Sequence, residues 1–416
     1  MTDTGTREQR VWATLDFLTG LAAAMIESGY ATDATHQTVT ACAAAMGVEP
    51  VTFAGAGRMV TVEYVFADRR AATRTRVAAT LDSFDCDRMK RLKNVARAVV
   101  TEGLDPGAAQ ARLAAAELGP PPWPWWFLPF GGALLSLCIA LQVGGSVAAA
   151  CAAAVALPPV WALGRGLGVI AVPRLYATAL QTVLAGALGV GAHLIGVIAV
   201  SEAAVVIATV WVLLVPMPQL VATAADAVNA DTVTATARAA SSLLAVGGMV
   251  LGGALVVTMV ERAALRPVDP HLPVLPVWLA VLFSVLGAVG NAVFNSGAKD
   301  LLIPAAVAGL FTATTNQCLI HLAHVSPDWS GSVAAVVLGF AAAATAERLR
   351  VPISALILVG ITGALLPGLV LYQGLVIELF HDSGLGYFVR GFAICVGLGV
   401  GAALGVLAFV LVRRRP

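Results

Sequence analysis

The sequence predicts a polytopic, all-α membrane protein preceded by a small α+β domain. Three observations lead to this fold class: an apolar composition, an uneven placement of charge, and a series of long apolar segments. Hydrophobic residues make up 59% of the 416 positions and charged residues only 12%, about half the charge of an average soluble protein. Residues 1–122 contain 13 Lys/Arg and 14 Asp/Glu, whereas the other 294 contain 12 and 10. Because a soluble protein spreads charge over its whole surface, residues 123–416 must face lipid.

The composition also excludes several classes of protein. A net charge of +1 gives no electrostatic support for a nucleic-acid partner. The six cysteines lie far apart without a CxxC pair, so we expect neither a disulfide framework nor a metal site. No GxSxG, HExxH or P-loop motif occurs, and we predict no catalytic residue and no cofactor. The first helix carries Asp16 and Glu27 and lacks a cleavable apolar core, which argues against a signal peptide.

Residues 1–122 are predicted to form a cytoplasmic α+β domain. Apolar residues at helical spacing predict four helices, with a break at Ser28-Gly29 between the first two: 12–26, 35–46, 88–101 and 106–117. Alternating β-branched and aromatic residues predict a hairpin from strands 51–53 and 59–66. The basic stretches 69–76 and 88–93 are interpreted as solvated helix faces. Pro120-Pro121-Pro122-Trp123 marks the boundary, since prolines stop a helix and tryptophans prefer the membrane interface.

Ten apolar segments follow, each long enough to cross about 30 Å of hydrocarbon with adjustment at its ends. They are 125–143, 146–163, 175–196, 202–220, 238–260, 274–294, 300–320, 330–346, 352–377 and 390–412; the second and eighth are short and the fourth is interrupted. With the N-terminal domain in the cytoplasm, the inside loops hold nine Lys/Arg and the outside loops three. The positive-inside rule therefore predicts an inner-membrane protein with both termini in the cytoplasm.

A weak internal repeat divides the membrane part into two halves, 123–262 and 263–416. Leu214-Val215-Pro216 and Leu365-Leu366-Pro367 lie 151 residues apart, which corresponds to five helices. Because five is odd, two such halves have opposite orientations in the membrane. Inverted repeats of this kind are a common plan of secondary transporters.

The two prolines of the repeat predict interrupted helices. A proline inside a helix frees the carbonyl four residues back, so Pro216 frees Val212 and Pro367 frees Gly363. In hydrocarbon such a carbonyl needs a protein partner, water or a ligand. The prolines are therefore either packing kinks or parts of a substrate site. Gly363 and Gly368, which bracket Pro367, allow another backbone or a substrate to approach closely.

A polar segment follows the first of these prolines. Asp226 and Asn229 are neighbours on a helix, whereas Asp231 and Arg238 share a face but lie about 10 Å apart, too far for direct pairing. One interpretation is a solvated cytoplasmic loop. The other is an acidic lip that binds an ammonium group or relays a proton.

Further polar residues lie within the apolar segments. Tyr372 and Gln373 follow Pro367, and Asn316 and Gln317 stand out on the seventh segment. These side chains bind either a substrate hydroxyl or carboxylate, or neighbouring helices.

Several motifs together make the chain similar to the threonine/serine exporter family of bacteria, over almost its whole length. In the N-terminal domain these are Ser28-Gly29, Met46-Gly47 and Gly103-Leu104-Asp105-Pro106. In the membrane part they are Val215-Pro216, Asp226, Asp231, Ala237-Arg238 and, most specifically, Leu366-Pro367-Gly368-Leu369-Val370-Leu371-Tyr372-Gln373-Gly374-Leu375. The family usually has glycine at the positions of Met217 and Ala230, so these two residues bear on the size of the substrate.

The resemblance implies export of L-threonine and L-serine driven by the proton motive force. The leading hypothesis is a secondary exporter that binds its substrate between the two halves and couples transport to a proton through Asp226 or Asp231. The hypothesis is compatible with a homo-oligomer. One alternative is an exporter of another small metabolite or peptide. A second is an N-terminal hydrolase or ligand-sensing domain on a membrane anchor.

Overall fold

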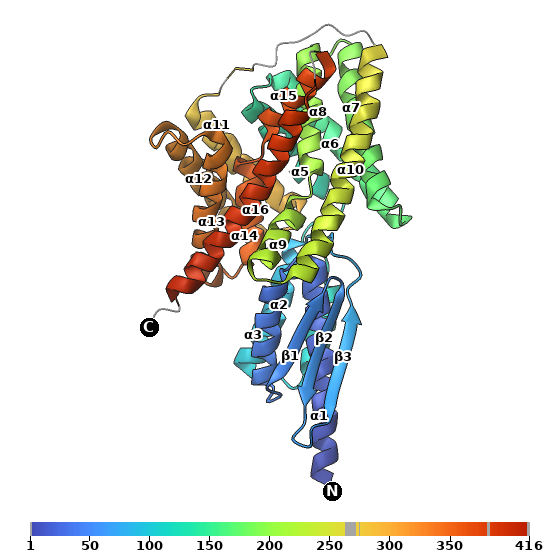
Figure 1. The fold of residues 1–416 in the computed structure, drawn as a ribbon, viewed down its shortest axis with the longest axis vertical. Coiled ribbons are helices and arrows are strands. Elements are labelled where there is room, and N and C mark those ends of the chain that lie inside the picture. Colours follow the sequence, from blue (N-terminus) through green and yellow to red (C-terminus); the bar gives the residue numbers. More distant parts are fainter. Residues whose placement is uncertain (1, 263–271, 274, 381–382, 414–416) are drawn as a thin grey trace.

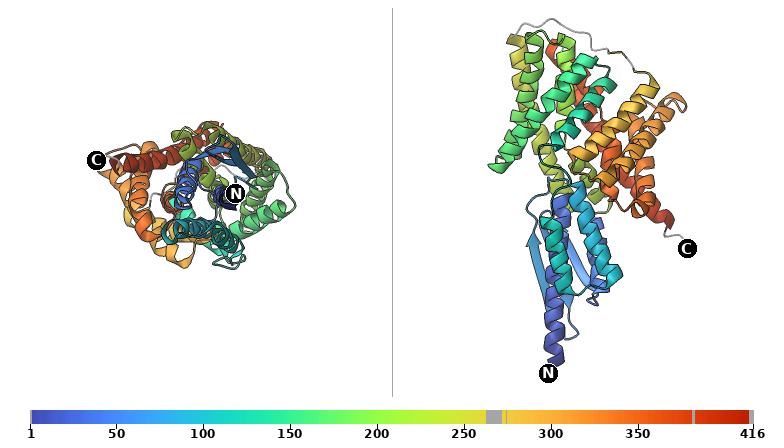
Figure 2. Two further views of the ribbon diagram at one scale, coloured as in Figure 1. Left: turned by 90° about the horizontal axis from the view of Figure 1, so that it is seen from below. Right: turned by 180° about the vertical axis from the view of Figure 1, so that it is seen from behind.

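The computed structural model describes residues 2–262, 272–273, 275–380 and 383–413 of the chain. Two units follow one another along the long axis (Figure 1). An N-terminal unit of helices and strands lies against one end of a larger, wholly helical unit, as the view from behind also shows (Figure 2).

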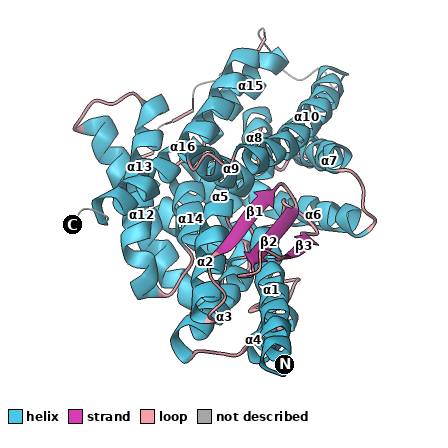
Figure 3. Ribbon diagram, turned by 60° about the horizontal axis from the view of Figure 1, so that its bottom comes forward, coloured by secondary structure: helices cyan, strands magenta, loops and turns pink. Residues whose placement is uncertain are grey.

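The N-terminal unit packs four helices and one sheet around a single core. Its elements are α1 (Thr2–Ser28), α2 (Thr32–Ala45), β1 (Val51–Ala56), β2 (Met59–Val65), β3 (Ala71–Val77), α3 (Cys86–Glu102) and α4 (Pro106–Leu118). The strands are antiparallel in the order β1-β2-β3, and α1 packs on β2 and β3 (Figure 3). Val60 and Val62 of β2 point into the core and are fully buried, together with Leu15 and Leu18 of α1.

The predicted helices and the hairpin are present, but one prediction in this unit is wrong. The basic stretch 69–76 is not a helix face; most of it forms the third strand. Thr73 and Thr75 lie on the exposed outer face of β3, whereas Arg74 lies on the opposite face, toward α1, and forms an ion pair with Asp16 at 2.6 Å. In this stretch arginine alternates with β-branched residues, a pattern with a period of two that is typical of a strand. The high charge of the stretch led instead to its interpretation as a solvated helix.

The helical unit begins after the Pro-Trp boundary. Its helices are α5 (Leu128–Val143), α6 (Val147–Val169), α7 (Arg174–Leu194), α8 (Val200–Leu214), α9 (Met217–Val228), α10 (Thr232–Arg262), α11 (Val277–Phe294), α12 (Lys299–His321), α13 (Pro327–Leu349), α14 (Ile353–Ala364), α15 (Gly368–Phe380) and α16 (Leu385–Arg413).

Within the described residues, seven helices are long and apolar enough to cross a membrane, and nine if the bent pairs α8–α9 and α14–α15 each count as one. The apolar helix α5 is shorter, with 16 residues. The predicted second and eighth segments are not short, because α6 and α13 each extend over 23 residues. The predicted ends of the fourth segment are also wrong, since α9 continues to Val228.

The same kinds of helix pair pack in both parts of the helical unit. α5 packs on α6 and α7 on α10, as α11 packs on α12 and α13 on α16. The bent pairs occupy corresponding places in the chain, fourth in each series. Contact of α5 with α11 and of α9 with α16 joins the two series into one bundle.

Candidate functional site

The first helix break lies between α8 and α9. α8 ends at Leu214, Val215 is extended, and Pro216 precedes the first residue of α9, so the two helix axes differ by 41°. Proline lacks an N–H and clashes with the carbonyl four residues back, which ends the helix here. The predicted interruption at Pro216 is therefore confirmed. Val212, whose carbonyl it frees, lines a cavity.

The second break lies between α14 and α15, whose axes differ by 49°. The side-chain amide of Gln142 on α5 donates to the carbonyl of Gly363 at 3.1 Å. A protein side chain thus satisfies the group that Pro367 frees. Glycine at 363 is also required for packing, because a Cβ there would lie 2.6 Å from the main-chain nitrogen of Ala288 on α11.

A proximal cavity of about 270 Å³ lies beside the first break, on the side of the N-terminal unit. Residues 212–219 of the break form one wall, and Leu366 of the second break contributes to another. Phe84 and Asp82, from the loop between β3 and α3, close the end nearest the N-terminal unit. The polar side chains that line the cavity are Asp82, Arg174, Gln181, Gln219, Asn291, Asn295 and Thr362.

Most of these polar groups already have partners. Asn291 donates to the carbonyl of Leu358 at 3.4 Å and accepts from Asn295 at 2.8 Å, and Gln181 donates to Val160 at 3.0 Å. Thr362 differs, since its hydroxyl is buried and has no hydrogen-bond partner among the described residues. Buried hydroxyls are normally hydrogen-bonded, so Thr362 is the group in this cavity most in need of a ligand or water.

A distal cavity of about 170 Å³ lies beside the second break. It is lined by Gln142 at the end of α5, Ser284 in the first half of α11, and Asn316 and Gln317 of α12. The opposite ends of α5 and α11 lie at the N-terminal unit, which Asn295 contacts through its carbonyl. The distal cavity is therefore the one farther from that unit. Its Asn316 has a buried side-chain oxygen without a partner in the part of the chain that is described.

Leu366 lies between the two cavities and lines both. It precedes Pro367 in the second break, where the backbone is not helical. One apolar side chain on an irregular segment thus separates two polar cavities. The two cavities thus form a proximal and a distal compartment on either side of this residue.

A buried ion pair joins α9, α10 and the N-terminal unit. Arg238 Nε lies 3.0 Å from Asp226 Oδ2, and the two side chains are 1% and 0% exposed. The main-chain N–H of Thr32 donates to Asp226 Oδ1 at 2.7 Å. Arg238 donates to the carbonyls of Tyr30 at 2.8 Å and Leu81 at 3.5 Å. The pair therefore anchors the N-terminal unit, and the interpretation of this segment as a solvated loop is wrong for Asp226.

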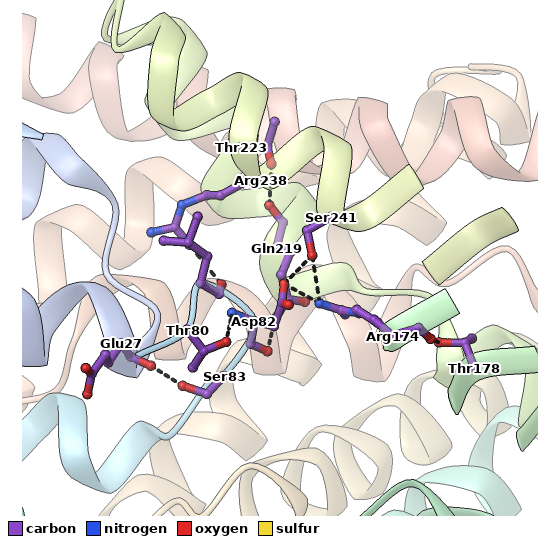
Figure 4. Close-up of polar contacts among 11 residues, drawn as sticks. Glu27, Thr80, Asp82, Ser83, Arg174, Thr178, Gln219, Thr223, Arg238 and Ser241 are labelled. Carbon is purple, nitrogen blue, oxygen red and sulfur yellow. Dashed lines mark hydrogen bonds and ion pairs between the residues drawn. The ribbon is translucent and has the colours of Figure 1, made fainter. Parts of the chain in front are cut away.

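A second charged pair lies at the proximal cavity (Figure 4). Arg174, the first residue of α7, forms an ion pair with Asp82, whose Oδ1 also accepts from Ser241 at 2.6 Å. Gln219 donates to the main-chain carbonyl of Asp82. Asp82 and Arg174 are 36% and 26% exposed, so solvent reaches this pair, unlike Asp226 and Arg238.

The structure brings some of the predicted site residues together and separates others. Pro216 lines the proximal cavity, Asn316 and Gln317 line the distal one, and Gly363 and Pro367 belong to the second break. Gly368 follows in the same break, packed against Val143.

The remaining predicted residues line neither of these two cavities. Tyr372 is fully buried in the apolar core beside α8, and Gln373 follows it on α15. Asp226 and Arg238 form the buried ion pair, while Asn229 and Asp231 lie near the turn between α9 and α10.

Sequence reasoning missed Asp82, Arg174 and Gln142. Each reaches the site from an element remote in the chain: Asp82 lies 137 residues from its partner Gln219, and Gln142 lies 221 from Gly363. No local pattern reports such contacts. A polar glutamine in an otherwise apolar segment was the one available signal for Gln142.

Comparisons with known proteins agree with the resemblance seen in the motifs. The profile of the ThrE family, described as "Putative threonine/serine exporter", matches residues 16–260. The chain is 27% identical over 340 residues to "Probable threonine/serine exporter" of Mycobacterium tuberculosis, covering 78% of this chain and 62% of that protein. It is 27% identical over 216 residues to "Threonine/serine exporter" of Corynebacterium glutamicum, covering 51% and 44%.

The chain thus spans about three fifths of the first relative and less than half of the second. No solved structure matches.

Proposed function

This chain belongs to the threonine/serine exporter family, and we propose that it is a multi-pass secondary transporter that moves L-threonine and L-serine out of the cell. The observation that carries the proposal is the pair of polar cavities beside the two helix breaks, separated by Leu366. A transporter needs a compartment that can open to each side of the membrane in turn. The names of the two relatives supply the class of substrate.

In this proposal the helical unit consists of two inverted five-helix halves, α5–α10 and α11–α16. Support comes from the matching helix pairs and from the equivalent positions of the bent pairs. Counting α5 and each bent pair as one crossing gives ten, an even number that suits termini on the same side. α16 ends at the same end of the helical unit to which the N-terminal unit is attached (Figure 1). With the arginine bias of the loops, we place that end in the cytoplasm of an inner membrane.

The first break suits a small zwitterion. The N-terminus of α9 opens on the proximal cavity, and the positive end of a helix dipole favours a carboxylate. Amide and hydroxyl groups of Asn291, Asn295 and Thr362 surround the same space. A hydroxyl-bearing side chain fits this wall better than an apolar one, because buried polar groups reject a ligand that leaves them unpaired.

We propose the proton motive force as the energy source. Of the acidic residues near the first break, Asp82 lines the proximal cavity, whereas Asp226 is occupied by Arg238. A carboxylate on the path can exchange a proton with the passing solution, and a fully buried, paired one is poorly placed to do so. We therefore propose Asp82, which is partly exposed in the cavity, rather than the fully buried Asp226, as the carboxylate on the path.

Efflux from loaded cells tests the proposal. Cells that carry or lack the gene are loaded with L-threonine by feeding a threonine-containing dipeptide, and external threonine is followed with time. We expect faster efflux with the gene, and collapse of that difference after addition of an uncoupler. Equal efflux with and without the gene would rule out threonine export. A difference that survives the uncoupler would rule out coupling to protons but would leave threonine export standing.

A further inference from the structure

Asp82 and Arg174 form a charged pair between the two units in the wall of the proximal cavity. Asp82 belongs to the loop of the N-terminal unit that precedes α3, and Arg174 is the first residue of α7. Both side chains line the cavity and are partly exposed, by 36% and 26%, so a solute in the cavity can reach them. By contrast, Lys90 and Asp300 also pair across the two units but line neither cavity.

The carboxylate of Asp82 is held firmly and retains room for a further donor. Its backbone is fixed by Gln219, which donates to the carbonyl, and by Thr80, whose hydroxyl accepts from the N–H at 3.0 Å. Arg174 and Ser241 both bind Oδ1. Among the described residues no hydrogen bond reaches Oδ2, so this oxygen can accept from an ammonium group.

Arg174 is equally suited to an additional acceptor. A guanidinium has five N–H donors, and the contacts of Arg174 with Asp82 and Ser241 both use Nη1. The residue begins α7, where the helix dipole is positive. A carboxylate would therefore be attracted by both the side chain and the helix end, and it could bind the guanidinium in bidentate fashion.

The hydroxyl of Thr362 provides an independent indication of a ligand in this cavity. Thr362 is only 7% exposed, lines the cavity from α14, and has no partner for its hydroxyl among the described residues. The cavity thus combines an acidic group, a basic group and an unpaired hydroxyl. These three features match the ammonium, carboxylate and side-chain hydroxyl of one small amino acid.

We propose that Asp82 and Arg174 bind the α-ammonium and α-carboxylate groups of the transported amino acid, so that the N-terminal unit supplies part of the transport site. The inference rests on the proposed function. A zwitterion that enters between the two side chains replaces each partner with an equivalent charge. Neither group is then left unpaired, which keeps the free-energy cost of separating the pair low.

Three ligands and three variants test this assignment on the purified full-length protein. The ligands are L-threonine, threonine amide, which lacks the carboxylate, and 3-hydroxybutyrate, which lacks the ammonium group. The variants are Asp82→Asn, Arg174→Gln and, as matched control, Asp300→Asn, which breaks a pair across the two units away from the cavity. Affinity is measured by calorimetry, and thermal melting verifies that each variant folds.

We expect Asp82→Asn to weaken binding of threonine and threonine amide about tenfold or more while leaving 3-hydroxybutyrate within about twofold. Arg174→Gln should weaken threonine and 3-hydroxybutyrate by a similar factor and spare the amide. Asp300→Asn should change no affinity more than about twofold.

This crossed pattern is one that a merely structural role would not produce. Equal losses for all three ligands, or no loss in either cavity variant, would overturn the inference and leave threonine export intact. Absence of threonine binding by the unmodified protein would overturn the proposed function together with this site.

Discussion

The two helix breaks share a proline and a bend, but different interactions stabilise them. At the first break, α9 is held by a buried ion pair and by contacts to the N-terminal unit, and the proximal cavity beside it contains both an acidic and a basic side chain. At the second break, the freed carbonyl of Gly363 is bound by the uncharged amide of Gln142, and the polar lining of the distal cavity is amide and hydroxyl.

The difference indicates that the two helix breaks have different roles in transport. Charged groups gather where the N-terminal unit covers the bundle, and they can recognise a zwitterion or a proton there. Among the described residues, no charged side chain lines the distal cavity beside the second break, and Leu366 lies between the compartments. We infer that the first break selects the solute and the second controls its passage.

The largest loss of stability is expected when one partner of the buried ion pair between Asp226 and Arg238 is removed. Arg238→Met leaves the carboxylate of Asp226 buried, with the N–H of Thr32 as its one remaining partner among the described residues. We expect a loss of about 3–5 kcal/mol in stability, because an uncompensated buried charge is costly. Thermal unfolding in detergent, with proteolysis to detect release of the N-terminal unit, measures it.

The same substitution at an exposed pair provides the control. Arg390 pairs with Asp328 at 2.5 Å, and both side chains are partly exposed. Arg390→Met should cost less than about 1 kcal/mol. The double change Arg238→Met with Asp226→Leu should recover much of the loss. Equal melting of the Arg238 and Arg390 variants would refute the anchoring role of the buried pair.

A smaller effect is expected at the second break. Gln142→Leu removes the donor to the carbonyl of Gly363 and leaves that group buried without a partner. The expected cost is about 1–3 kcal/mol, again from thermal melting. Gln373→Leu on α15, which removes no hydrogen bond of the described residues, is the matched control and should have little effect. If both variants melted alike, the amide contact would not stabilise the break.

The smallest effect concerns the turn between α9 and α10. Ala230 has a φ of +63°, in the left-handed region that a side chain disfavours. Ala230→Gly should therefore stabilise the protein by about 1 kcal/mol or less. In contrast, Ala227→Gly within α9 should destabilise it by about 0.5–1 kcal/mol. A lower melting temperature for Ala230→Gly would show that the strain is absent.

Much of the fold could be predicted because it depends on local patterns. Apolar segments and the prolines at 216 and 367 report helix length and helix breaks directly, and the structure confirms both interruptions. β3 was missed because its arginines suggested a solvated helix. The resemblance leads us to expect glycine at position 230, and the positive φ of Ala230 gives a physical reason for that expectation.

Less of the candidate site could be predicted, because it depends on contacts between remote elements. Asn316 and Gln317 were identified by their polarity within an apolar segment, and they do line a cavity. Asp226 and Arg238 are 12 positions apart on two helices, and only the turn at 229–231 brings them together. Asp82 resembles any surface aspartate until the N-terminal unit is placed against α7.

We further propose that the proximal cavity faces the cytoplasm and the distal cavity the outer side of the membrane, and cysteine accessibility tests this proposal most directly. In a background without the six native cysteines, Asn295→Cys reports the proximal cavity and Asn316→Cys the distal one. A small impermeant thiol reagent is applied to right-side-out and inside-out vesicles. We predict labelling of position 295 only from the cytoplasmic side and of position 316 only from the outer side. Labelling of both from one side would contradict the account.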